Sequence, residues 1–167
     1  MNISYYLNLR QQYHPRILQF IFILESPPIS GLYFYDENGN ISEPLFSEMM
    51  KLLNFKPQNK REGLLFFRNC GYLLVDATYR PVNNLKGKIR DEEILKNFKY
   101  LVEDLNDICN EIRIPIILVK ANICRMLESK LKQEGFNIVN NGAIIPFPST
   151  GQQKRFHQEI SKIHQPA

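Results

Sequence analysis

A Pro-Phe-Pro-Ser-Thr loop near the C-terminus carries residue types that could bind a phosphate group. It follows an apolar run at residues 143–146, which we expect to be a strand that ends at the prolines. Ligands of α/β sheets bind at the carboxyl ends of the strands. The hydroxyls of Ser149 and Thr150, the next backbone N–H groups and the cations Lys154 and Arg155 would suit phosphate there.

Two further apolar runs end in polar residues. Residues 20–24 read Phe-Ile-Phe-Ile-Leu and lead into Glu25, Ser26 and two prolines, and residues 72–75 lead into Asp76. Because the carboxyl ends of parallel strands meet at one edge of a sheet, the loop after residues 20–24 and the Pro-Phe-Pro-Ser-Thr loop predict a single site.

Length and composition predict one domain over residues 1–167. The chain has 44% hydrophobic and 23% charged residues, which is ordinary for a soluble globular protein. Its net charge of +4 permits an anionic partner without requiring one.

No pattern in the sequence calls for a metal, a disulfide or a membrane. The cysteines lack paired spacing and read as reduced thiols, and the histidines are isolated from one another. No signal-peptide core is present, and no apolar run approaches the roughly 20 residues that span a bilayer. We therefore expect a cytoplasmic protein without metal or cofactor. The residues concerned are Cys70, Cys109, Cys124, His14, His157 and His164.

Hydrophobic periodicity predicts alternating strands and helices. Helices are expected within 3–19, from Pro44 through Leu53, over 91–112, at about 122–134 and over Gln153–Ile163. Strands are expected at 20–24, 72–75, 116–119, 136–139 and 143–146, with a loop or small hairpin at 31–40 and a charged loop at 58–63. Continuous apolar strands between helices predict a parallel sheet that is covered on both faces.

Four segments in chain order resemble motifs of the uracil-DNA glycosylase superfamily, over about residues 18–160. They are Ile23-Leu24-Glu25-Ser26-Pro27-Pro28, Gly31-Leu32-Tyr33-Phe34, Leu73-Leu74-Val75-Asp76-Ala77-Thr78 and Pro146-Phe147-Pro148-Ser149-Thr150. The resemblance implies a three-layer αβα sandwich with a central, mostly parallel four-stranded sheet. It also implies hydrolysis of the N-glycosidic bond of a flipped deaminated or modified base in DNA, as in base-excision DNA repair, by a monomer that needs only water.

The resemblance also assigns roles to residues. Glu25 and Ser26 take the catalytic positions, with Glu25 as the carboxylate that orients water. The base-binding positions hold Pro27, Phe34, Asp76 and Phe147. The DNA-binding positions hold Pro148, Ser149, Thr150, Gln152, Lys154 and Arg155.

Two departures from the family pattern bear on activity. Phe147 stands where the family has a hydrogen-bond-donating His, and the loss of such a donor costs about 2.7–4 kcal/mol of transition-state stabilisation. Asp76 stands where the family has a base-reading Asn. An ionised Asp76 only accepts hydrogen bonds, so we expect ordinary uracil to be a poor substrate, whereas an Asp76 held neutral by burial could read uracil.

Each of these residues also has a purely structural interpretation. Glu25 could pair with a cation, Asp76 could cap a turn, and Phe34 and Phe147 could belong to the core. Lys154, Arg155, Lys86, Lys88 and Arg90 could be solvated surface charges.

Two alternative functions therefore stay open beside a glycosylase. One is a catalytically inactive nucleic-acid-binding or interaction module of the same fold. The other is an unrelated Rossmann-like enzyme for a small phosphorylated ligand, against which no Gly-x-Gly-x-x-Gly pattern follows any strand.

Overall fold

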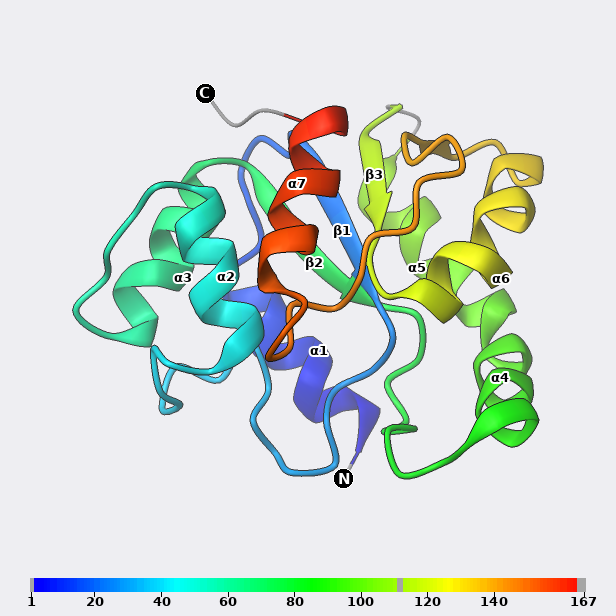
Figure 1. The fold of residues 1–167 in the computed structure, drawn as a ribbon, viewed down its shortest axis with the longest axis horizontal. Coiled ribbons are helices and arrows are strands. Elements are labelled where there is room, and N and C mark those ends of the chain that lie inside the picture. The colour runs from blue at the N-terminus through cyan, green and yellow to red at the C-terminus, as the bar shows by residue number, and fades with distance from the viewer. Residues whose placement is uncertain (1, 111–112, 165–167) are drawn as a thin grey trace.

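The computed structural model, which describes residues 2–110 and 113–164, is an α/β fold built on one four-stranded sheet (Figure 1). The strands are β1 (Phe20–Leu24), β2 (Tyr72–Asp76), β3 (Pro115–Leu118) and β4 (Asn137–Ile138). The helices are α1 (Ile3–Gln12), α2 (Pro44–Leu52), α3 (Lys60–Asn69), α4 (Gly87–Lys96), α5 (Phe98–Cys109), α6 (Ala121–Gln133) and α7 (Gln153–Ile163).

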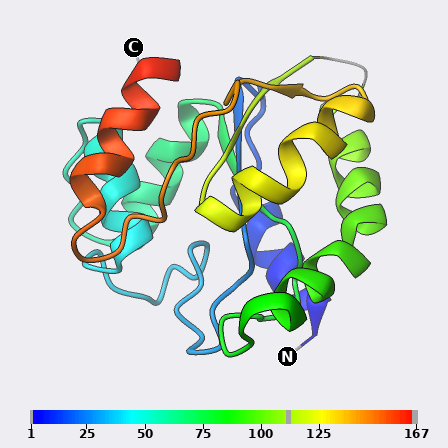
Figure 2. The same ribbon diagram turned by 45° about the vertical axis from the view of Figure 1, so that its right-hand side comes forward.

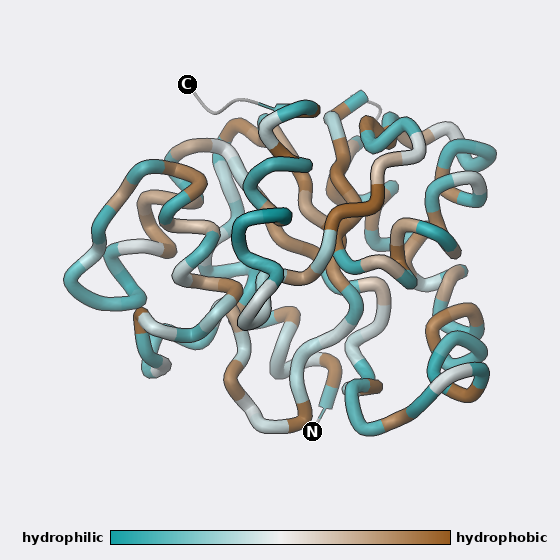
Figure 3. The backbone as a smooth tube through the Cα atoms, in the orientation of Figure 1, coloured by the Kyte–Doolittle hydropathy of each residue, from teal (hydrophilic) through white to brown (hydrophobic). Residues whose placement is uncertain are grey.

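All four strands are parallel, in the order β2-β1-β3-β4. Figure 2 shows α2, α3 and α7 on one side of the sheet and α1, α5 and α6 on the other. Every residue of β1 and β2 is buried, which explains why these strands read as continuous apolar runs. Figure 3 shows the same segments as the hydrophobic centre of the molecule.

The register of β2, β1 and β3 brings their carboxyl ends side by side. Leu24 of β1 pairs with Asp76 of β2, and the backbone N–H of Val119 donates to the carbonyl of Ile23 at 2.9 Å. As a result Glu25, Asp76 and Lys120 all lie at one edge of the sheet.

The structure confirms the strands expected at 20–24, 72–75 and 116–119 to within one residue, and the C-terminal helix at Gln153–Ile163. The strand expected at 136–139 is shorter, at Asn137–Ile138, and the expected strand at 143–146 is wrong. The side chain of Asn140 forms the hydrogen bonds that such a strand would make to Leu118, accepting from its N–H at 2.8 Å and donating to its carbonyl at 3.0 Å. Residues 143–146 form a backbone hydrogen bond with the segment after β3 at one point, where the carbonyl of Ile145 accepts from the N–H of Lys120 at 2.8 Å.

Two other element predictions need correction. The charged segment at 58–63 is not only a loop, because α3 begins at Lys60 with the Asn59 side chain accepting from the N–H of Glu62 at 2.9 Å. The single helix expected over 91–112 is two helices that meet at Asn97, where φ is −92° and ψ is 0°. Residues 111–112 of that prediction lie outside the described residues.

Over the described residues, no helix is both long and apolar enough to cross a membrane. In the same part of the chain, no group of three or more His, Cys, Asp or Glu side chains is arranged to hold a metal ion.

Candidate ligand cavity at the carboxyl edge of the sheet

A cavity of about 280 Å³ opens at the carboxyl ends of β1 and β2. Its walls come from the loop after β1, the start of α2, the loop after β2, and single residues beyond β3 and before α7. The residues expected to be catalytic or base-binding all line it, although they come from distant parts of the sequence. They are Glu25, Ser26, Pro27, Phe34, Asp76 and Phe147.

The residues expected to contact DNA lie outside the cavity walls. Pro148 is buried, whereas Ser149 and Thr150 are exposed in a turn closed by a hydrogen bond from the N–H of Gln152 to the carbonyl of Ser149 at 2.9 Å. The remaining two, Lys154 and Arg155, are exposed in the first turn of α7.

Glu25 is buried in a cage of hydrogen-bond donors. Lys120 donates to its Oε1 at 2.7 Å, Asn122 to its Oε2 at 2.6 Å, and Arg90 binds both oxygens, with Nε at 2.9 Å from Oε2 and Nη2 on Oε1. Burial raises the pKa of Glu25, but the hydrogen bonds from Arg90, Lys120 and Asn122 outweigh burial and lower it below its ordinary value. Glu25 is therefore an ionised carboxylate with cationic partners, as its structural interpretation anticipated.

The cage limits what Glu25 can do chemically. A carboxylate has about four lone-pair sites, and four donor contacts occupy those of Glu25. A group whose pKa is lowered and whose acceptor sites are filled is a poor general base in this arrangement. Arg90 is not a solvated surface charge, because its guanidinium forms part of the cage.

Lys120 is a cavity residue that the sequence analysis did not single out. It is the first polar residue after the apolar run at 116–119 and is separated from the end of β3 by Val119 alone, so the strand-end rule that selected Glu25 would also have selected it. Its backbone has φ +86° and ψ 133°, a left-handed conformation that a residue with a Cβ rarely adopts. A strained backbone persists where surrounding contacts hold the residue in place, as they do in ligand-binding loops. Lys120 is held by its backbone bond to Ile145 and its side-chain bond to Glu25.

We expect Lys120→Gly to be more stable than Lys120→Ala by about 1–2 kcal/mol. Both variants remove the ammonium group and its bond to Glu25, but only glycine relieves the positive φ. Urea denaturation of the two purified variants measures the difference directly. An alanine variant as stable as the glycine variant would show that the backbone of Lys120 is unstrained.

Asp76 lies at the end of β2, and its side chain has no clear partner. It is 4% exposed, and its Oδ2 is buried without a hydrogen bond from any described residue. Its backbone N–H donates to the hydroxyl of Tyr79 at 3.3 Å, and Arg10 donates to the same hydroxyl at 2.6 Å. Arg10 is itself held by two hydrogen bonds of 2.8 Å to Asp104.

Burial makes Asp76 a neutral carboxylic acid near pH 7. Desolvation raises its pKa to about 8, with Arg10 opposing that rise and the charge of Glu25 adding to it. The expectation that uracil is disfavoured assumed an ionised Asp76, and burial removes that premise. A neutral carboxyl group presents one O–H donor and one C=O acceptor.

The aromatic candidates differ in their surroundings. Phe34 is 4% exposed and packs edge-on against Tyr35 and Phe67, so its ring belongs to the core as well as to the cavity wall. Phe147 is half-buried and also lines the cavity. Tyr33 also lines the cavity, and its buried hydroxyl has no partner within the described part of the chain.

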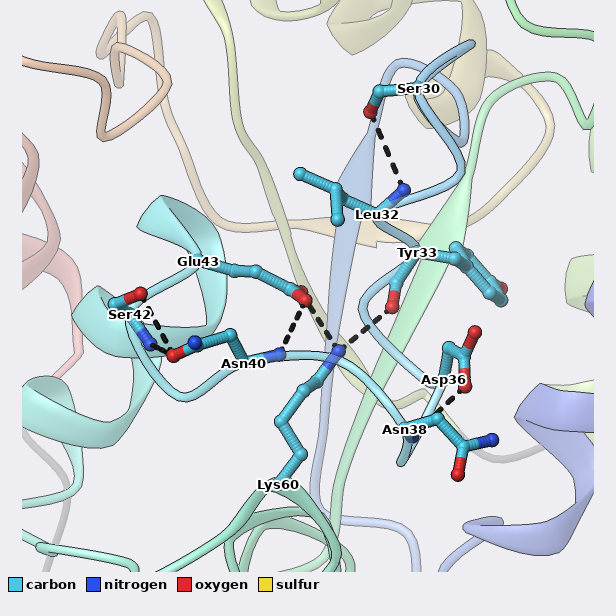
Figure 4. A network of polar contacts seen from close by, with 9 residues as sticks. All are labelled: Ser30, Leu32, Tyr33, Asp36, Asn38, Asn40, Ser42, Glu43 and Lys60. Atoms are coloured by element: carbon cyan, nitrogen blue, oxygen red, sulfur yellow. Dashed lines mark hydrogen bonds and ion pairs between the residues drawn. The ribbon is translucent and has the colours of Figure 1, made fainter.

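A buried ion pair holds the wall that α2 contributes. Lys60 Nζ donates to Glu43 Oε2 and to the carbonyl of Tyr33, both at 2.9 Å, while the N–H of Asn40 donates to Glu43 Oε1 at 2.8 Å (Figure 4). Both charged side chains are almost fully buried, at 0% and 8% exposure. The segment from Tyr33 to Glu43 is thereby fixed to α3.

The fold and the cavity define an α/β protein with a cavity at the carboxyl edge of a parallel sheet. No protein-family model, curated protein or solved structure matches the chain. The resemblance to the uracil-DNA glycosylase superfamily therefore rests on the four sequence motifs.

Proposed function

We propose that the protein recognises a planar nucleobase that is extruded from DNA and held in the cavity at the carboxyl edge of the sheet. The observation that carries the proposal is the buried carboxyl group of Asp76 at the cavity, whose Oδ2 has no hydrogen-bond partner among the described residues. Because burial raises the pKa of this group to about 8, it keeps its proton at neutral pH. Its O–H donor and C=O acceptor complement the N–H and C=O edge of a lactam base such as uracil or hypoxanthine.

The rest of the lining supports a planar ligand. Pro27, Phe34 and Phe147 provide flat or apolar surface, and ligand cavities combine such walls with a few polar groups that fix orientation. Exposed cations occur at Lys86, which precedes α4, and at Lys154 and Arg155 in the first turn of α7. They would meet the DNA backbone while the base enters the cavity.

Base recognition is favoured over base excision because of Glu25 and Phe147. Hydrolysis needs a group that orients water, and the acceptor sites of Glu25 are occupied by Arg90, Lys120 and Asn122. Phe147 supplies no donor to a departing base.

A DNA glycosylase activity is the second candidate, and Lys120 favours it. The ammonium group lines the cavity, and in this position a cation could stabilise the negative charge that develops on a departing base.

The test of the first candidate is binding of oligonucleotides that carry a single uracil, hypoxanthine or mismatched base, measured by fluorescence anisotropy. Asp76→Asn keeps one donor and one acceptor, so we expect its preference for the modified base to persist at pH 7. Asp76→Leu removes both, and leaving the partner groups of a bound base unsatisfied costs about 1–3 kcal/mol, or roughly 5- to 150-fold in Kd. An Asp76→Leu variant that keeps the base preference would refute the assignment.

The second candidate needs a separate assay. The same oligonucleotides are incubated with excess protein, and alkaline cleavage reports abasic sites. Strand cleavage that is lost in Lys120→Met would establish excision. Intact strands after long incubation would eliminate excision and leave base recognition standing.

A further inference from the structure

The positive charges around the cavity outnumber the negative ones. Glu43 is neutralised by Lys60, and Asp76 is neutral. The remaining carboxylate, Glu25, faces two cations, Arg90 and Lys120. The described groups at the cavity therefore leave one positive charge without a negative partner.

The hydrogen-bonding groups that remain for a ligand are mostly donors. Lys120 has three N–H bonds and spends one on Glu25, with no other described partner. Asn83 lines the cavity, but its side-chain carbonyl accepts from the N–H of Ile29 at 3.0 Å, which leaves its NH₂ group to donate. Asp76 and Tyr33 add two hydroxyl donors.

The ionised carboxylates of the cavity have their acceptor sites engaged, which leaves the carbonyl oxygen of Asp76 as the carboxyl acceptor for a ligand. The oxygens of Glu25 are held by its cage, and Glu43 accepts from Lys60 and from the backbone of Asn40. An exocyclic amino group on a bound base would meet donors at Lys120 and Asn83, and buried donors left facing donors are costly. A ligand rich in oxygen acceptors meets no such conflict.

We infer that the cavity selects a planar oxo-heterocycle in its monoanionic form, of the xanthine type, over neutral and amino-substituted bases. The inference rests on the proposed function and names the class of base that the same site takes. One negative charge on the ligand balances Lys120, and its oxygens accept from Lys120, Asn83 and the hydroxyl of Asp76. Charge-assisted hydrogen bonds of this kind are about twice as strong as neutral ones.

The strained backbone of Lys120 fits this role. The backbone of Lys120 is held at φ +86° by its N–H bond of 2.8 Å to the carbonyl of Ile145, and its ammonium group is held at the cavity by the bond of 2.7 Å to Glu25 Oε1. Preorganised donors lose little entropy when the ligand binds.

The experiment is calorimetric titration of the whole protein with free xanthine, hypoxanthine and adenine. Xanthine loses a ring proton near neutral pH, whereas hypoxanthine stays neutral and adenine carries an amino group. At pH 7.5 we expect xanthine to bind roughly tenfold to a hundredfold more tightly than hypoxanthine, with adenine weakest. Between pH 6 and 7.5 the affinity for xanthine should rise while that for hypoxanthine stays level.

A matched pair of variants assigns the preference to one residue. Lys120→Met should reduce the advantage of xanthine over hypoxanthine to below about threefold, whereas Lys99→Met, which removes an exposed lysine of α5, should leave it unchanged. The comparison of the two ligands in the unmodified protein decides the question even where Lys120→Met folds poorly.

The outcomes separate the inference from the function on which it rests. Equal binding of xanthine and hypoxanthine overturns the anionic preference and leaves base recognition intact. Absence of binding by all three bases, with oligonucleotides also bound irrespective of their modified base, overturns both.

Discussion

Asp76→Asn is expected to stabilise the fold strongly at neutral and alkaline pH. Burial raises the pKa of Asp76 from 3.8 to about 8, so the native protein holds a proton that the unfolded chain releases. At a pH above both pKa values, this difference corresponds to roughly 6 kcal/mol, since one pKa unit is about 1.4 kcal/mol. Asparagine fills the same space, offers the same donor and acceptor, and has no proton to lose.

The sign of the pH dependence follows from the direction of the shift. Below about pH 4 both states are protonated, and Asp76 contributes no pH-dependent term. Between pH 4 and pH 8 the unfolded chain binds fewer protons than the native protein, so the free energy of unfolding falls as the pH rises. Above pH 8 both states are ionised and the loss is complete. The groups that face Asp76 and tune this window are Arg10, Glu25, Tyr79 and Asp104.

Urea denaturation of the wild type and of Asp76→Asn at pH 4, 6, 7 and 9 tests the prediction. The two proteins should differ little at pH 4, and the gap in the free energy of unfolding should widen to several kcal/mol at pH 9. Asp107→Asn, which changes an exposed aspartate of α5, serves as the control and should track the wild type. Parallel curves for wild type and Asp76→Asn would mean that Asp76 is ionised in the native protein.

A residue that weakens the fold in this way needs a reason to be present. Buried acids with strongly raised pKa values and no partner occur at ligand and catalytic sites more than in ordinary cores. We expect Asp76→Asn to raise stability and to retain base binding at pH 7. This combination would show that the side chain binds the base through its hydrogen-bonding groups, whereas its loss of a proton only lowers the stability of the fold.

Part of the cavity could be predicted from the sequence because buried parallel strands read as uninterrupted apolar runs. The first polar residue after such a run marks the carboxyl edge, and this rule locates Glu25, while the family resemblance adds Asp76. The same rule applies to Lys120, which follows the apolar run at 116–119. The partners of Glu25 could not be predicted, since Arg90 and Lys120 are 65 and 95 residues away.

The element errors also have local causes. At the start of α3, Asn59 is followed three residues later by Glu62, which is a typical helix-start pattern. The many charged residues of the segment favoured a loop instead. The apolar residues keep their helical spacing across Asn97, so hydrophobic periodicity could not predict that the helix ends there. The missing strand at 143–146 depends on the side chain of Asn140 replacing a backbone partner, which no pattern of hydrophobicity encodes.

Lys60→Met is expected to destabilise the protein by roughly 3–5 kcal/mol. Methionine matches the length of the lysine side chain, but it leaves Glu43 buried at 8% exposure without its counter-ion and the carbonyl of Tyr33 without its donor. The backbone cannot open to hydrate Glu43 easily, because Gly39 lies so close that a Cβ there would be 2.1 Å from Glu43 Oε1. Urea denaturation at pH 7 measures the loss.

A double-mutant cycle distinguishes a buried charge from a simple loss of packing. Glu43→Gln removes the charge and keeps an acceptor for the N–H of Asn40, so Lys60→Met combined with Glu43→Gln should recover most of the stability that Lys60→Met loses. Lys96→Met, which removes a lysine that is 72% exposed, should change the free energy of unfolding by less than about 0.5 kcal/mol. Additive losses in the double variant would contradict a coupled pair.

The ion pair of Lys60 and Glu43 stabilises the fold and also holds one wall of the cavity. Glu43 and the next three residues form one wall, and Lys60 holds that wall against α3 through Glu43 and Tyr33 (Figure 4). We therefore expect Lys60→Met to weaken base binding even at temperatures where the variant stays folded, because the α2 wall is no longer fixed. The double variant with Glu43→Gln should regain stability without regaining full affinity, since the bond to Tyr33 is still missing.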